Sequence, residues 1–142
     1  VGLAAAALAE ARRYAAERQA FGQAIEQHQA IQLLLADMAT RLVAARLLTQ
    51  EAARQKDSGR RADMACAMAK QFASEACVEI VRDALRVHGG HGYIAGTPVE
   101  RYYREAPLYV VGEGTNEMQR LQVARRMLAG ADEDFLGLPP RG

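Results

Sequence analysis

The sequence predicts an all-α protein, an antiparallel bundle of the four-helix type, and three observations lead to this prediction. Alanine is the commonest residue and occurs with much Leu, Arg, Glu and Gln, a composition of high intrinsic helix propensity. The chain contains only 4 prolines and lacks the alternating Val, Ile and Thr runs that are typical of strands. Apolar residues recur at helical spacing along two long stretches, and short loops join the predicted helices.

The first predicted helix covers residues 1–19 and ends near "RQAFGQ", where Gly22 provides a break. Its buried face is expected to contain Ala4, Ala7, Leu8, Ala11 and either Tyr14 or Ala15. The second helix covers residues 28–56, because its apolar residues follow the i, i+3, i+4, i+7 rule. The residues on its buried face are Ile31, Leu34, Leu35, Met38, Leu42 and Ala45.

A third helix is expected over residues 61–88, after the turn residues Asp57, Ser58 and Gly59. Many of its inward residues are small, so that neighbouring helices can approach closely. These inward residues are Ala65, Ala69, Phe72, Ala73, Ala76, Ile80 and Ala84. The glycine-rich "HGGHGY" ends this helix, and Pro98 then favours the start of a short helix over "PVERYYREA".

The last helix is expected to begin at about Thr115, a residue type that caps helix N-termini well. Its inward residues would be Met118, Leu121, Ala124 and Leu128. Residues 131–142, which are rich in turn residues, are expected to form a loosely ordered tail. The prediction is therefore one helical domain over residues 1–130.

Composition and charge exclude several classes of function. The 142 residues carry a net charge of +1, so there is no electrostatic argument for a nucleic acid or an anionic membrane as a partner. No apolar run approaches the length of a membrane span, so we expect no membrane-spanning helix. The chain begins with Val1 rather than Met, and it is therefore expected to be a piece of a longer protein.

Cys66 and Cys77 are eleven positions apart on one predicted helix, which separates their Cα atoms by roughly 16 Å. That separation is too long for a disulfide. We expect both to be small buried side chains in a reducing compartment, and the expected location is the cytoplasm of a bacterium.

The segment "GHGYIA" formally matches the G-x-G-x-x-A pattern of a dinucleotide-binding loop. That loop follows a strand, whereas here a long helix precedes it, so this interpretation is rejected. His88 and His91 have H-x-x-H spacing, but no third ligand lies at a useful distance, and no metal site is predicted. Gly89, Gly90 and Gly92 together indicate instead that something packs directly on the backbone.

The local sequence alone indicates Glu113 as the candidate catalytic residue. Gly112 and Gly114 flank it, so a ligand can approach the backbone, and the free N–H groups of the helix that follows suit an anion or a polarised carbonyl. The residues alone do not say which reaction this carboxylate serves. By the same reasoning Arg18 is better explained as a solvated cation at a helix end.

Five segments, taken in order, closely resemble the C-terminal helical domain of flavin-dependent acyl-CoA dehydrogenases. They are "RRYAAERQAFGQAIEQHQAIQLLLADMA", "AMAKQFASEA", "RVHGGHGY", "PVERYYREA" and "GEGTNEMQRLQVAR". The resemblance covers residues 1 to about 130. It implies that an acyl-CoA thioester loses its α-proton to Glu113 while the β-hydrogen leaves as hydride to N5 of FAD. It also implies that Gly114 contacts the bound acyl-CoA.

The resemblance further implies a set of FAD contacts, several of them to the flavin of a neighbouring subunit, and it replaces the solvated-cation explanation of Arg18. The implied contacts are Arg18, Ala20, Phe21, His28, Gln29, Arg86, Val87, His88, Gly89, Gly90, Thr115 and Glu117. The expected partners are an acyl-CoA substrate, an electron-transfer flavoprotein as acceptor, and further copies of the chain in a dimer or tetramer.

Two departures from the family pattern affect these expectations. Arg86 stands where the family usually has Gln, and Gly112 precedes the base where some members have a bulky residue. The helical and β-domains that normally come first in the family do not lie within these residues, so the chain alone is expected to be inactive. The alternatives are a non-catalytic helical oligomerisation module and a flavin oxidase on the same fold.

Overall fold

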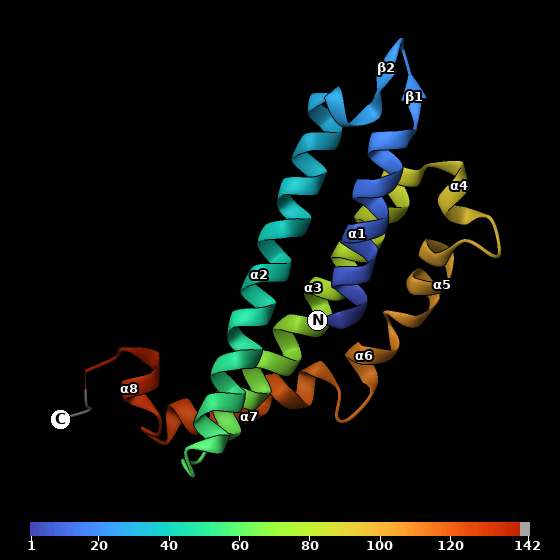
Figure 1. The fold of residues 1–142 in the computed structure, drawn as a ribbon. Helices are drawn as coiled ribbons and strands as arrows, with labels where there is room; N and C mark the ends of the chain where they lie inside the picture. Colours follow the sequence, from blue (N-terminus) through green and yellow to red (C-terminus); the bar gives the residue numbers. More distant parts are fainter. Residues whose placement is uncertain (140–142) are drawn as a thin grey trace.

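A computed structural model describes residues 1–139 of the chain, and helices form most of it (Figure 1). Three long helices make the body: α1 (Gly2–Glu17), α2 (Gln29–Asp57) and α3 (Asp63–His88). The helix α2 runs antiparallel to α1 and α3, and α3 packs against both of them (Figure 1). The all-α prediction is confirmed, and the bounds of the three helices agree with the predicted ones to within about two residues.

Alanines let the three long helices pack closely around one core. The buried face of α1 consists of alanines alone, at Ala4, Ala7, Ala11 and Ala15. Bulkier side chains from the facing helices fill the space that these methyl groups leave, and Met38 and Ile80 are fully buried there. Burying a side chain of that size stabilises the fold by about 1.5–3 kcal/mol.

Short elements connect and cover this body. Between α1 and α2 lie the strands β1 (Gln19–Ala20) and β2 (Gln23–Ala24), which pair antiparallel, and one turn of 3-10 helix, η1 (Ile25–Gln27). After α3 come α4 (Gly90–Tyr93), α5 (Pro98–Glu105), α6 (Leu108–Val111), α7 (Asn116–Leu128) and α8 (Glu133–Leu136). The helix α7 packs against α3, at the lower end of the bundle in Figure 1.

Caps explain where two of these helices begin. The hydroxyl of Thr97 accepts a hydrogen bond from the Glu100 N–H, and Pro98 occupies the first position of α5. In the same way Thr115 caps α7 and accepts from the Met118 N–H. Both predicted helix starts are confirmed.

Several predicted burials are wrong within the described chain. On α7, Met118, Leu121 and Leu128 expose 51%, 47% and 65% of their surface, because the side of this helix that meets α3 carries the fully buried Asn116 instead. Phe72 on α3 is 39% exposed. Cys66 is exposed and Cys77 is buried in the core, although both line the same cavity; both are free thiols.

The end of the chain contains more local structure than the sequence indicates. Phe135 of α8 packs against a small cluster formed by Ala52, Ala65 and Ala69. Whether residues 131–142 are loosely ordered stays a prediction, and residues 140–142 lie outside the described part. Within residues 1–139, no helix combines the length and apolar character that crossing a bilayer requires.

Candidate active site

The Glu113 loop joins α6 to α7 and has an unusual backbone. The helix α6 ends where the Gly112 N–H donates to the Leu108 carbonyl oxygen at 2.8 Å. Glu113 then has φ +56° and Gly114 φ +87°. A glycine adopts such an angle freely, but a residue with a side chain pays about 1–2 kcal/mol for it. The surrounding structure must therefore hold Glu113 in this conformation, as is typical of functional positions.

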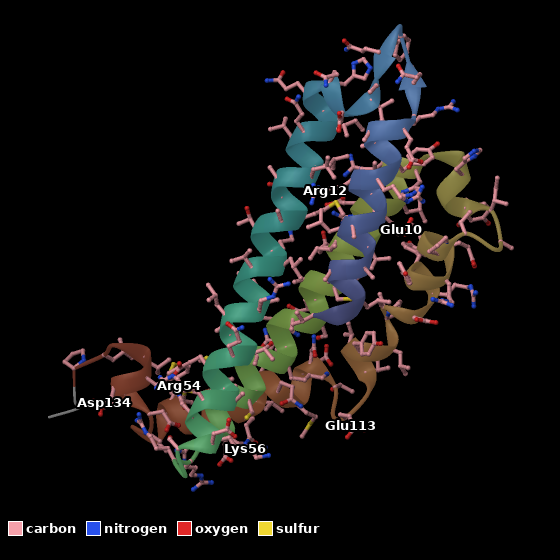
Figure 2. All side chains as sticks on the ribbon, in the orientation of Figure 1. Glu10, Arg12, Arg54, Lys56, Glu113 and Asp134 are labelled. Carbon is pink, nitrogen blue, oxygen red and sulfur yellow. The ribbon has the colours of Figure 1, made fainter. Side chains whose placement is uncertain are left out.

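Two groups of Glu113, the carboxylate and the backbone N–H, are unpaired within residues 1–139. Its carboxylate is exposed and makes no hydrogen bond or ion pair there, and its backbone N–H has no acceptor. Figure 2 shows the labelled Glu113 side chain on the loop between α6 and α7. A free carboxylate beside a free N–H offers a proton acceptor and a hydrogen-bond donor at adjacent positions.

A network centred on Asn116 ties this loop to α3. The fully buried amide of Asn116 accepts from Lys70 Nζ at 2.7 Å and donates to Ser74 Oγ at 2.9 Å and Glu75 Oε1 at 3.1 Å. Lys70 Nζ also donates to two backbone oxygens of the loop region. Sequence reasoning missed this network, because Asn116 follows its side-chain partners on α3 by 41 to 46 positions.

Glu113 borders a cavity of about 890 Å³. The lining comes from α1, α2, α3 and α6 and is mostly apolar. It includes Leu3, Ala69, Ala73, Leu108, Tyr109 and Gly112, together with Lys70. A mostly apolar cavity with a carboxylate at its edge can hold a hydrocarbon chain next to a proton acceptor.

A second cavity, of about 540 Å³, lies at the opposite end of α3. It brings together five residues predicted as FAD contacts: Arg18, Val87, His88, Gly89 and Gly90. The Arg18 guanidinium is exposed and has no hydrogen bond or ion pair within residues 1–139. Sequence reasoning missed four more lining residues, which are Tyr14, Ile25, His91 and Ile94.

His88 is fixed in this second cavity by its neighbours. Its ring stacks on Tyr14 with centroids 4.4 Å apart, and Nδ1 lies 2.8 Å from the Ala84 carbonyl oxygen. Because a carbonyl only accepts, Nδ1 carries the hydrogen and Nε2 is left as an acceptor. Burial lowers the pKa of His88, which favours this neutral form.

The three glycines at the end of α3 and in α4 are present for different structural reasons. A Cβ on Gly92 would lie 2.9 Å from the His88 Cβ and 3.0 Å from the Leu85 carbonyl oxygen, so Gly92 is required by packing within the chain. Gly89 has φ +57°, which favours glycine. A Cβ on Gly90 would meet no atom within 4 Å, so the space over that backbone is open to a ligand.

The remaining predicted FAD contacts lie outside this cavity. Ala20, Phe21, His28 and Gln29 belong to the hairpin and the start of α2, where Phe21 is 97% exposed at the tip. The His28 ring packs edge-on against Phe21, and Nε2 lies 3.2 Å from the Ala20 carbonyl oxygen. Arg86 is turned to the buried carboxylate of Asp83 at 3.1 Å and does not line the cavity.

Thr115 and Glu117 stand beside Glu113 instead, at the start of α7. The backbone N–H of Glu117, and then the Thr115 hydroxyl, lower the pKa of the Glu117 carboxyl, as expected at a helix N-terminus. Lys70 near the Glu113 loop and His88 in the second cavity are eighteen positions apart on α3, which corresponds to roughly 27 Å. One copy of the chain therefore presents two separate groups of candidate residues.

The fold and these residues define the class of protein. The family model described as "Acyl-CoA dehydrogenase, C-terminal domain" matches residues 1–128, and the chain belongs to this family. The expectation drawn from the five resembling segments is confirmed at this level.

Three relatives show the range within that class. An acyl-CoA dehydrogenase of Bacillus subtilis is 45% identical over 130 residues, which are 92% of this chain and 34% of that protein. A subunit of the caffeyl-CoA reductase–Etf complex of Acetobacterium woodii is 44% identical over 128 residues, 90% of this chain and 34% of the subunit. The solved structure of butyryl-CoA dehydrogenase from Megasphaera elsdenii superimposes with a TM-score of 0.88 at 37% identity, covering 89% of this chain and 33% of that one. The chain thus spans about a third of the length of the relatives it matches.

Proposed function

We propose that this chain is the C-terminal part of an FAD-dependent acyl-CoA dehydrogenase in which Glu113 removes the α-proton of an acyl-CoA thioester. The observation that carries the proposal is the unpaired carboxylate of Glu113, held with φ +56° at the edge of a mostly apolar cavity. Backbone strain and a free carboxylate are both typical of a catalytic base and serve no evident structural purpose here.

The proposed reaction is an α,β-dehydrogenation. Glu113 takes the α-proton and becomes protonated, while the electron pair of the α C–H bond forms the carbon–carbon double bond. FAD, when bound, would supply the oxidant, and the β-hydrogen would leave to it with its electron pair as hydride at N5. The product is a trans-2-enoyl-CoA, and the two electrons then leave to an acceptor, for which we propose an electron-transfer flavoprotein.

The backbone around the base can stabilise the charge that develops. An α-proton of a thioester is much less acidic than a carboxylic acid, so the thioester oxygen must receive hydrogen bonds in the transition state. The Glu113 N–H, which has no acceptor within residues 1–139, is available for this role. Gly114 has φ +87°, which favours glycine, and a Cβ there would lie 3.0 Å from Gln119 Nε2, so a larger residue would disturb the loop beside the base.

The second cavity fits the FAD that this chemistry needs. Arg18 offers an unpaired guanidinium suited to a pyrophosphate, and the neutral His88 offers an acceptor. Gly90 leaves its backbone open on that side. Because this group lies at the other end of α3 from Glu113, we propose that two copies of the chain contribute to each flavin site, Phe21 and its hairpin reaching across to the neighbour. A homo-oligomer, a dimer or a tetramer, follows from this proposal.

A second candidate function is the same reaction in the opposite direction. The similarity to a caffeyl-CoA reductase subunit favours the reverse reaction, in which protonated Glu113 would return a proton to the α-carbon. The same residue serves both directions, since each step is reversible. A flavin oxidase and a non-catalytic oligomerisation module remain the alternatives. The expected bacterial cytoplasmic location stays a prediction.

Anaerobic flavin bleaching tests the proposal. The full-length protein, as wild type and as Glu113→Gln, is mixed with a panel of acyl-CoAs, and the visible flavin band is followed. We expect bleaching in the wild type and its loss in Glu113→Gln with flavin still bound. Equal bleaching in both proteins would move the base elsewhere, and a wild type that binds no flavin would favour the non-catalytic module. Residues 1–142 expressed alone are expected to give no bleaching.

A further inference from the structure

We propose that Lys70 is a positioning residue that holds the Glu113 loop in its active conformation, an inference that rests on the proposed function of Glu113. The ammonium of Lys70 donates three hydrogen bonds to this part of the chain. Its Nζ lies 3.1 Å from the Val110 carbonyl oxygen, 2.8 Å from the Gly114 carbonyl oxygen and 2.7 Å from Asn116 Oδ1.

These three acceptors lie on both sides of the base. Val110 is in the last turn of α6, before Glu113, while Gly114 and Asn116 lie one and three positions after Glu113. One ammonium on a long helix therefore fixes the backbone that enters the loop and the backbone that leaves it. The last carbonyls of a helix have no partner within that helix, so α6 offers an acceptor here.

The position of Asn116 is itself fixed. It is fully buried and bonded to Ser74 and Glu75 on the next turn of α3. Lys70 and Asn116 thus form a rigid link from α3 to the start of α7. The Glu113 backbone, which would relax from φ +56° if it were free, lies between the atoms that this link holds.

A lysine suits this role better than an arginine. The ammonium has three hydrogens that point in different directions, and here all three meet an acceptor. A planar guanidinium would spread its donors in one plane and would not reach the same three oxygens. Because all donors of Lys70 are used, it does not pair with the Glu113 carboxylate, which remains free to accept a proton.

The experiment compares Lys70→Met with the wild type in the full-length protein with flavin bound. Three quantities are measured: anaerobic flavin reduction by an acyl-CoA, the Kd of that acyl-CoA, and amide hydrogen exchange of residues 110–116. Displacing a catalytic group by about 1 Å costs up to about a hundredfold in rate. We therefore expect the reduction rate constant to fall about 10- to 100-fold and loop exchange to rise, with the Kd changed less than about threefold.

Matched variants separate this role from a general effect of charge or folding. Arg46→Met removes an exposed cation of α2 that has no hydrogen bond or ion pair within residues 1–139, and it should behave as wild type. Lys70→Gln keeps two N–H donors and should lie between the wild type and Lys70→Met. If Lys70→Met does not yield a folded flavoprotein, Lys70→Gln carries the test with the same criteria.

The outcomes are distinct. Slower reduction together with faster loop exchange supports the proposal. Unchanged reduction with faster exchange overturns it, because the loop would then not need to be held for catalysis. Slower reduction with unchanged exchange also overturns it, since Lys70 would then act on the ligand directly. A wild type that no acyl-CoA reduces refutes the proposed function instead, and loop exchange still reports whether Lys70 holds the loop.

Discussion

Replacing Asn116 by alanine should loosen α7 from the rest of the domain. Asn116 is fully buried, and its amide accepts from the charged Lys70 and donates to Ser74 and Glu75. A hydrogen bond to a charged group is worth about 1.5–3 kcal/mol and a neutral one about 1 kcal/mol. Losing these bonds should lower the free energy of opening α7 by at least about 3 kcal/mol.

Native-state hydrogen exchange on the full-length protein measures this change locally, because it reports the opening of one helix rather than unfolding of the whole protein. A loss of about 3 kcal/mol makes opening of residues 116–128 about a hundredfold more frequent. The matched control is Gln119→Ala on the same helix. Gln119 makes only two long bonds, of 3.4 and 3.3 Å, to the Glu113 and Gly114 carbonyl oxygens. It should change exchange less than about tenfold. Equal effects of the two variants would refute the reasoning that a buried polar link holds α7.

Three further predictions concern the second cavity. Arg18→Gln should lower the flavin content of the purified protein at equal protein concentration, because the guanidinium is the one cation proposed for the pyrophosphate; unchanged flavin absorbance would contradict that role. Gly92→Ala should displace the His88 ring and lower the thermal midpoint of the protein, whereas Gly90→Ala, whose Cβ meets open space, should not crowd the protein; thermal unfolding compares the two, and equal midpoints would contradict the packing argument. His88 has its pKa lowered by burial, so below the ordinary pKa of about 6.5 the unfolded chain binds more protons than the folded one and stability falls as pH falls. Thermal midpoints between pH 7.5 and 5.5 should therefore drop more in the wild type than in His88→Gln, with the exposed His91→Gln behaving as wild type.

Elements with strong local signals could be predicted from the sequence, because their causes lie within a few residues. The start of α5 depends on Thr97 and Pro98, and the start of α7 on Thr115. The glycines around Glu113 likewise indicated a special backbone, and Glu113 does have a positive φ. The apolar pattern of α7 was less informative, because a pattern indicates that a face is to be covered and does not say by what.

The parts that sequence reasoning missed depend on distant contacts. Lys70 stands alone in an alanine-rich helix and carries no local signal, and its acceptors follow 40 to 46 positions later. Either Tyr14 or Ala15 was expected on the buried face; Ala15 is fully buried, and Tyr14 packs against the core while its ring also stacks on His88 at the second cavity. Only the folded chain brings these pairs together, so no local pattern could have indicated them.

Exchange of the substrate α-proton with solvent tests most directly that Glu113 is the base. The full-length protein is incubated with a saturated acyl-CoA in D₂O without an external electron acceptor, and NMR follows deuterium entering the α-position. We predict exchange in the wild type and at least about a hundredfold slower exchange in Glu113→Gln, since a positioned general base contributes about 10² to 10⁴ in rate. Exchange at the wild-type rate in Glu113→Gln, with acyl-CoA and flavin both bound, would contradict the assignment of Glu113 as the base.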